Sequence, residues 1–296
     1  MRTRDFLFGI AAACLWGGGG VVGVVFGEHE GFAPVGIAAW RMALAGVSLL
    51  AVLAVIGRFR PGEWSRAAWV RMVVTGALTA GFEYAFFTSV TLASVGLATL
   101  VGIGSAPVVV AGYDAVVLRQ RPSVRSVVAL GLSLVGLGLL VGGSLDEGSR
   151  MLLGVAVALA AGVSFAAITI VNRAPVPDLH PVALTGGAFT AGAVLMLPFA
   201  LLAGTGLPHD LEGWGIAIVL GVIITGLAYV LFLTSLQTVP PFVATIITLL
   251  EPLLGAILGA IVFGERLGWL GAIGGALMGA AVLLLRPQRD EPETIH

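Results

Sequence analysis

Long apolar stretches separated by short polar breaks run along the whole chain. Ten stretches come close to the roughly 20 residues that a helix needs to cross the hydrocarbon of a bilayer. Their approximate ranges are 6–26, 35–57, 69–90, 95–118, 124–143, 151–171, 181–203, 213–235, 242–263 and 267–285. Charged and turn-forming residues fill the breaks, as at 119–122 and 175–178. The pattern predicts an all-α membrane protein with ten transmembrane helices and no inserted soluble domain.

The second half of the chain repeats landmarks of the first half at a constant spacing of 145 residues. The matched pairs are Gly76 and Gly221, Gly81 and Gly226, Tyr84 and Tyr229, Phe87 and Phe232, Pro107 and Pro252, and Arg121 and Arg266. Because each copy crosses the membrane an odd number of times, the second copy is inverted relative to the first, as in secondary transporters. We predict two inverted five-helix repeats, 1–145 and 146–286, followed by a disordered cytoplasmic tail, 287–296.

Composition indicates that lipid is the main solvent of this chain. Hydrophobic residues make up 58% and charged residues 10% of the sequence, and the mean hydropathy is +1.06. That leaves too little polar surface to cover a soluble globule. The net charge is −1 and no basic patch is present, so the bilayer is an expected partner and nucleic acid is not.

The basic residues, all of them arginine, predict the orientation in the membrane. If both termini are cytoplasmic, twelve of the 15 arginines fall on the cytoplasmic side, only Arg150 and Arg266 fall outside, and Arg41 lies within a span. Cytoplasmic loops of membrane proteins carry such an excess of arginine and lysine. We therefore predict a multi-pass protein of the bacterial inner (plasma) membrane with both termini in the cytoplasm.

Four ionisable residues within the spans break the repeat. Arg41, Glu83, Asp114 and Glu251 correspond to Gly186, Ala228, Gly259 and Ala106, in that order. A charged group inside a span is costly, so it normally faces a cavity or a partner and suggests function. Asp114 lies about one turn from the cytoplasmic end of its span, where an interfacial salt bridge with Arg119 or Arg121 is expected.

Arg41 and Glu83 lie at similar depth, each roughly 10 Å from the outer end of its span by residue count. Two interpretations remain open for them. Arg41 binds an anionic group of a substrate, or gates an outward mouth together with Glu83. Alternatively, the two side chains form a structural ion pair that neutralises both charges.

Glu251 lies deeper, directly before Pro252, and is a candidate for proton coupling, as is Glu83. The alternative is a hydrogen bond from a protonated Glu251 to the carbonyl group that Pro252 frees from the helix. Pro107 and Pro252 occupy matching positions near the middle of their spans. They are candidate hinges or, equally, static bends.

Several aromatic residues lie where they can contact a substrate. Trp16, Tyr84 and Tyr229 lie well inside spans, whereas Trp64, Trp69, Trp214 and Trp269 lie at span ends, as in an interfacial belt. The three inner residues are expected either to line a substrate cavity or to pack in the core. Trp40, beside Arg41, has the same two interpretations.

Signatures of enzymes and pumps are missing from the sequence. His29, His180, His209 and His296 fall in loops or termini, without a His-Glu-x-x-His motif or a Cys-His cluster. The chain has no lysine and therefore no Walker motif. We predict no metal, no cofactor, no enzymatic activity and no ATP-driven pumping.

One stretch near the C-terminus resembles a family signature. Leu250-Glu251-Pro252-Leu253-Leu254-Gly255-Ala256, followed by Phe263-Gly264-Glu265-Arg266-Leu267, is similar to the signature of the EamA family in the drug/metabolite transporter superfamily. Matching features are Trp16-Gly17, Arg41, Ala106-Pro107 and Arg121-Pro122. The chain departs from the family pattern at Arg119-Gln120-Arg121, where Gly-Glu-Arg is usual, and at Ala106, where a second glutamate is usual.

The resemblance covers essentially the whole chain and implies ten helices in two inverted repeats, cytoplasmic termini and a central cavity. It also implies transport of small organic metabolites without ATP. We expect a secondary transporter, working by alternating access, that exports amino acids or related metabolites as a monomer or weak dimer. Proton coupling is a hypothesis. The alternatives are an uncoupled facilitator or channel, a lipid-translocating protein, and a membrane-embedded enzyme that uses a Glu-Arg pair.

Overall fold

The computed structural model describes residues 1–93, 95–141, 150–264 and 268–287. Arg266, the predicted repeat boundary at 145–146, and residues 288–296 of the predicted tail lie outside the described residues.

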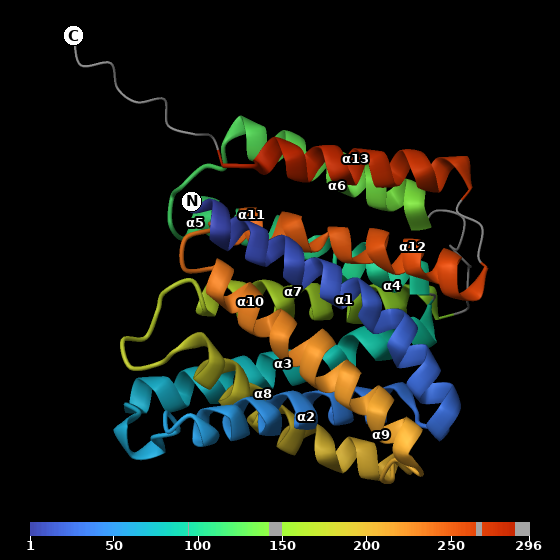
Figure 1. Cartoon of the computed structure of the whole chain (residues 1–296). Coiled ribbons are helices and arrows are strands. Elements are labelled where there is room, and N and C mark those ends of the chain that lie inside the picture. The colour runs from blue at the N-terminus through green and yellow to red at the C-terminus, as the bar shows by residue number, and fades with distance from the viewer. Residues whose placement is uncertain (94, 142–149, 265–267, 288–296) are drawn as a thin grey trace.

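Within these ranges every regular element is a helix (Figure 1). The first half contains α1 (Thr3–Glu30), α2 (Pro34–Val55), the 3₁₀ turn η1 (Pro61–Glu63), α3 (Arg66–Leu92), α4 (Val95–Gly102), α5 (Ser105–Val116) and α6 (Val124–Val141). The second half contains α7 (Met151–Val171), α8 (Pro181–Leu202), α9 (Leu211–Ile218), the π-helical segment η3 (Val219–Leu227), α10 (Ala228–Ser235), α11 (Pro241–Thr248), α12 (Leu250–Phe263) and α13 (Trp269–Leu285).

These elements form ten passes, which confirms the predicted all-helical membrane fold. Three passes are composite: α4 with α5, α9 with η3 and α10, and α11 with α12. Of the passes in the described part of the chain, nine have the length and apolarity of a membrane span, while α13 is apolar but has only 17 residues. Helix α1 begins and α13 ends at the same end of the bundle (Figure 1).

The two halves of the chain are packed into each other. The most extensive helix contacts are those of α2 with α8 and of α6 with α13, and in Figure 1 α6 runs beside α13 at one edge of the bundle. Helix α3 packs on α7 and α8, and α1 packs on α12 and α10. Because each of these contacts joins one half to the other, the core is built between the halves.

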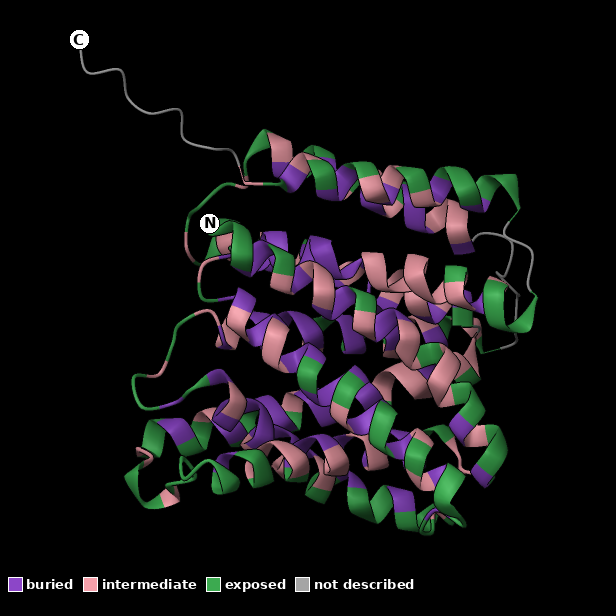
Figure 2. Cartoon of the chain, viewed as in Figure 1, coloured by how far each residue is buried: buried purple, intermediate pink, exposed green. Residues whose placement is uncertain are grey.

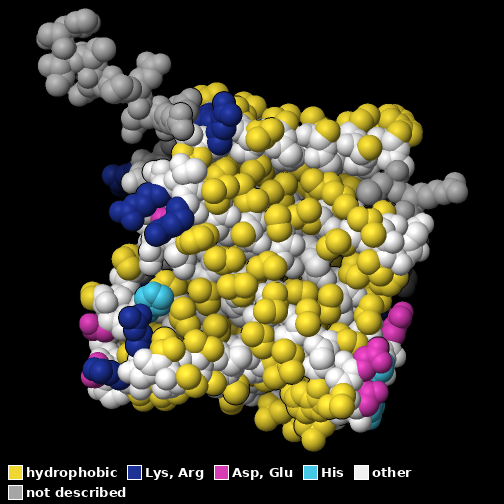
Figure 3. Space-filling view, viewed as in Figure 1, with side chains coloured by type: hydrophobic (Ala, Val, Ile, Leu, Met, Phe, Trp, Pro, Cys, Tyr) yellow, Lys and Arg dark blue, Asp and Glu magenta, His cyan; other side chains and the backbone are white. Residues whose placement is uncertain are grey.

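The distribution of side chains agrees with a membrane-spanning bundle. Buried residues lie mainly between the helices (Figure 2), and large apolar side chains such as Leu152, Leu202 and Leu211 are exposed. In Figure 3 apolar side chains cover the middle of the visible face and arginines gather at the end that holds the termini, while acidic and histidine side chains lie at both ends and form a group without arginines at the end opposite the termini. An apolar belt of this kind suits contact with lipid.

Helices α6 and α13 approach each other through a pair of glycines. A Cβ atom on Gly274 would overlap the carbonyl oxygen of Gly136, and a Cβ atom on Gly136 would lie 2.5 Å from the carbonyl oxygen of Gly274. Small residues allow such backbone contact in membranes, where van der Waals packing replaces the hydrophobic effect as the force between helices.

We expect Gly274→Val to destabilise the protein by about 1–3 kcal/mol, because the side chain forces α13 away from α6. Gly279→Val is the matched control on the same helix, since nothing lies within 4 Å of a Cβ atom there. Thermal unfolding of both variants in detergent measures the difference. If both variants lost the same amount of stability, the loss would come from the helix propensity of valine and not from the close packing of α6 on α13.

Candidate functional site

An ion pair between α2 and α3 forms the centre of the candidate site. Arg41 Nη1 lies 3.5 Å from Glu83 Oε2, and the side chains are 15% and 3% exposed, respectively. The structure therefore brings these two predicted residues together. A buried carboxylate is stable only when charge and hydrogen bonds compensate for the loss of water.

Thr225, which the sequence analysis missed, holds the other edge of the Arg41 guanidinium group. Arg41 Nε donates a hydrogen bond of 3.0 Å to Thr225 Oγ1, and Thr225 Oγ1 donates one of 2.8 Å to the carbonyl oxygen of Leu220. Both residues belong to the π-helical segment η3, and such segments are frequent at functional sites. Thr225 replaces Ala80 of the first repeat, so a search for polar as well as ionisable departures from the repeat would have found it.

Glu251 and Tyr229 belong to the same site. Both residues lie within the range of charge–charge interaction of Arg41 and Glu83, and Tyr229 lies within that range of Glu251. Glu251 lies in the first turn of α12 and is only partly buried, whereas the Tyr229 side chain is buried. The sequence suggested no partner for Glu251; the structure places it within the influence of Arg41.

Aromatic rings pack beside this charged group. Trp16 contacts Tyr229 edge to face at a centroid distance of 4.8 Å, and also packs on Phe232 and Phe165 at 5.3 and 6.1 Å. Tyr229 packs on Phe189 at 4.6 Å. The Trp16 Nε1 group is buried and has no hydrogen-bond partner among the described residues. Buried donors normally have a partner, so this indole group is a candidate donor to a substrate.

Trp40 and Tyr84 are not part of this cluster. Trp40 Nε1 donates to the carbonyl oxygen of Gly206 at 3.0 Å, and the indole ring packs on Trp214. Tyr84 is 47% exposed and packs on Phe199, which is also exposed. Its repeat partner, Tyr229, is buried in the site, so the two matched tyrosines have different surroundings.

Pro107 and Pro252 follow breaks in their passes. Pro107 is the third residue of α5, and Pro252 is the third residue of α12. A proline is tolerated at this position because the first N–H groups of a helix have no intrahelical partner. The breaks at Gly104 and Leu249 are themselves 145 residues apart, and discontinuous helices are typical of transporter binding sites. The hinge role remains a prediction.

Asp114 has a different partner from the one that the sequence suggested. Arg173 Nη1 lies 3.1 Å from Asp114 Oδ1 and donates a hydrogen bond to it. The expected partners were Arg119 and Arg121, which are neighbours along the chain. Arg173 follows α7, which packs on α5, so helix packing across the two halves determines the pairing.

The chain has clear relatives among known proteins. The EamA-like transporter family matches residues 4–142 and 152–286. The uncharacterized transporter YwfM of Bacillus subtilis (strain 168) is 30% identical over 288 residues, which is 96% of this chain and 95% of the relative. The threonine/homoserine exporter RhtA of Escherichia coli (strain K12) is 25% identical over 264 residues, which is 86% of this chain and 84% of the relative.

A solved crystal structure has the same fold, with a TM-score of 0.80 at 19% identity over 96% of this chain and 97% of the other. The ten-pass fold and its relatives define the class of this protein, a multi-pass membrane transporter. The chain belongs to the EamA-like transporter family of the drug/metabolite transporter superfamily, so the predicted family is confirmed. The family matches the chain in two segments, and the division into two repeats at 145–146 stays a prediction.

Proposed function

We propose that the protein exports a small amino acid or related metabolite across the bacterial inner membrane by alternating access. The arginine-rich end, which holds the termini, is then the cytoplasmic end. The observation that carries the proposal is the charge arrangement of the site. A partly exposed arginine, Arg41, lies within electrostatic range of two carboxylates, those of Glu83 and Glu251.

This arrangement matches a zwitterionic substrate. Arg41 suits a substrate carboxylate, since a guanidinium group binds planar carboxylates with two hydrogen bonds. Glu251 suits an ammonium group, and the rings of Trp16 and Tyr229 can cover an apolar or cationic portion. The name of the relative RhtA, a threonine/homoserine exporter, supports the same class of substrate.

Counterflow in proteoliposomes tests the proposal. Vesicles that hold the purified chain and unlabelled threonine or homoserine should accumulate the labelled amino acid transiently and saturably. Empty vesicles and vesicles loaded with a neutral sugar should not. An ohmic current without saturation would instead indicate a channel. Movement of labelled phospholipid between the leaflets would indicate a lipid-translocating protein. Either result would overturn the proposal.

A further inference from the structure

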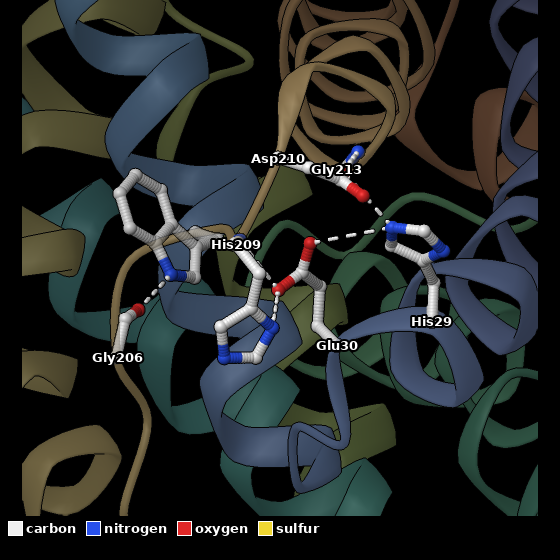
Figure 4. Close-up of polar contacts among 7 residues, drawn as sticks. His29, Glu30, Gly206, His209, Asp210 and Gly213 are labelled. Atoms are coloured by element: carbon white, nitrogen blue, oxygen red, sulfur yellow. Dashed lines mark hydrogen bonds and ion pairs between the residues drawn. The ribbon is translucent and has the colours of Figure 1, made fainter.

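Histidine and acidic side chains from two distant segments meet at the end of the bundle opposite the termini. His29 and Glu30 are the last residues of α1, and His209 and Asp210 directly precede α9 (Figure 4). The two segments belong to different halves of the chain and are about 180 residues apart, and the proposed transport function does not use them. The sequence predicted no metal site because none of these residues forms a local motif.

Glu30 is the central residue of the cluster. Its side chain is fully buried. Its Oε2 atom accepts a hydrogen bond of 3.0 Å from the backbone N–H of His209 and lies 2.7 Å from ring atom Nδ1 of the same residue. The other oxygen, Oε1, is buried and has no hydrogen-bond partner within the described ranges. Figure 4 shows Oε1 directed toward His29, whose Nε2 atom lies 3.9 Å away.

Asp210 completes the group from the start of α9. Its Oδ1 atom lies 3.1 Å from His29 Nε2 and accepts a hydrogen bond of 2.7 Å from Gly213 N–H. The Gly213 hydrogen bond first, and then the one with His29, hold the pKa of Asp210 below its ordinary value. The Asp210 side chain is about half exposed, so a cation in water can reach it.

We propose that His29, Glu30 and Asp210 form a binding site for a divalent first-row transition-metal cation, with Zn²⁺ as its representative. Each residue offers one ligand atom, and these atoms lie within 4.8 Å of one another. An imidazole nitrogen with two carboxylate oxygens is a donor set that suits such a cation, with water in the remaining position. The buried Oε1 atom of Glu30, which has no hydrogen-bond partner among the described residues, is the independent observation that indicates a ligand.

His209 acts on the metal through Glu30. It binds the carboxylate oxygen that faces away from the ligand atoms of His29 and so orients Oε1 toward them. Outer partners of this kind commonly hold the ligands of a metal in place. A Cβ atom at Gly213 would overlap Glu30 Oε1, so the glycine allows the carboxylate to lie this close to α9. Bound metal would tie the end of α1 to the start of α9.

Zinc binding to the full chain in detergent, purified without a polyhistidine tag, tests this proposal. Equilibrium dialysis followed by elemental analysis should find one Zn²⁺ per wild-type chain. His29→Ala, Glu30→Gln and Asp210→Asn should each lose this ion, and His209→Ala should weaken its binding about 10- to 100-fold. The matched controls are His180→Ala and Glu212→Gln, which remove a histidine and an exposed acidic residue that the site does not use.

Gel filtration and thermal unfolding identify any variant that fails to fold. If Glu30→Gln does not fold, Asp210→Asn decides the outcome, because asparagine can still cap the N-terminus of α9. A wild-type chain that binds no Zn²⁺, or Asp210→Asn and His29→Ala variants that bind it as the wild type does, would overturn the proposal. So would displacement of Zn²⁺ by a modest excess of Mg²⁺, because a cation that prefers oxygen ligands would then occupy the site.

Discussion

Arg41→Ala is expected to abolish saturable amino-acid counterflow and to destabilise the protein. The substitution leaves Glu83, which is 3% exposed, without the cation that lies 3.5 Å from it. Breaking a buried ion pair from one side costs about 3–5 kcal/mol. It also removes the charged hydrogen-bond donor for a substrate carboxylate. Such a bond contributes about 1.5–3 kcal/mol, which corresponds to a loss of roughly 10- to 100-fold in affinity.

The double variant Arg41→Ala/Glu83→Ala distinguishes the two roles of Arg41. With both charges removed, thermal stability should partly return, because no unpaired carboxylate remains buried. Counterflow should stay absent if Arg41 binds the substrate. Recovery of transport together with stability would instead show that the pair is structural only.

Arg173→Ala is a matched control for the loss of an ion pair at a more accessible position. Its partner Asp114 lies at 3.1 Å, and the Arg173 side chain is 29% exposed. Pairs near water contribute about 0–1 kcal/mol. Arg173→Ala should therefore unfold at nearly the wild-type temperature and retain counterflow.

Glu251→Gln is expected to abolish the response of transport to a pH gradient, while saturable counterflow persists at lower affinity, because glutamine still accepts a hydrogen bond from a substrate ammonium group but carries no charge. Glutamine keeps the shape and hydrogen-bonding capacity of the side chain but cannot take up or release a proton. Glu251 is the better candidate of the two carboxylates, because it is only partly buried, whereas Glu83 is buried against Arg41. Proton exchange requires access to water at some stage of the cycle.

Proteoliposomes with an imposed pH gradient measure this effect directly. The wild type should concentrate its substrate against a gradient, and Glu251→Gln should only equilibrate it. Glu83→Gln is the comparison, since it neutralises the other carboxylate of the site. Gradient-driven accumulation by Glu251→Gln would exclude Glu251 as the coupling residue. A wild type that never accumulates substrate would mean uncoupled facilitation.

Much of the fold follows from local features of the sequence. Runs of about 20 apolar residues determine the passes, because a helix must satisfy its own backbone hydrogen bonds in lipid. The 145-residue spacing between such pairs as Gly76 and Gly221 predicts two repeated halves. The matching breaks between α4 and α5 and between α11 and α12 are also marked in the sequence, because Pro107 and Pro252 lie just after them.

The site could be predicted only in part. Departure from the repeat selected Arg41 and Glu83, and counting residues along their spans placed the two at similar depth. The structure shows that they form an ion pair. The comparison of the two repeats considered only ionisable residues within the spans, so it missed Thr225, which is uncharged. The comparison also could not show that Tyr229 is buried and Tyr84 is exposed, because the two tyrosines occupy the same repeat position.

The sequence by itself determined the class of protein, the number of passes and the small set of charged residues within them. Only the tertiary structure decided which side chains meet: Trp16, Arg41, Glu83, Thr225, Tyr229 and Glu251 at the centre, and His29, Glu30, His209 and Asp210 at one end. The physical reason is that the rotation of a helix in the membrane depends on packing contacts such as the one between Gly136 and Gly274. Those contacts join residues more than a hundred positions apart, and no local pattern records them.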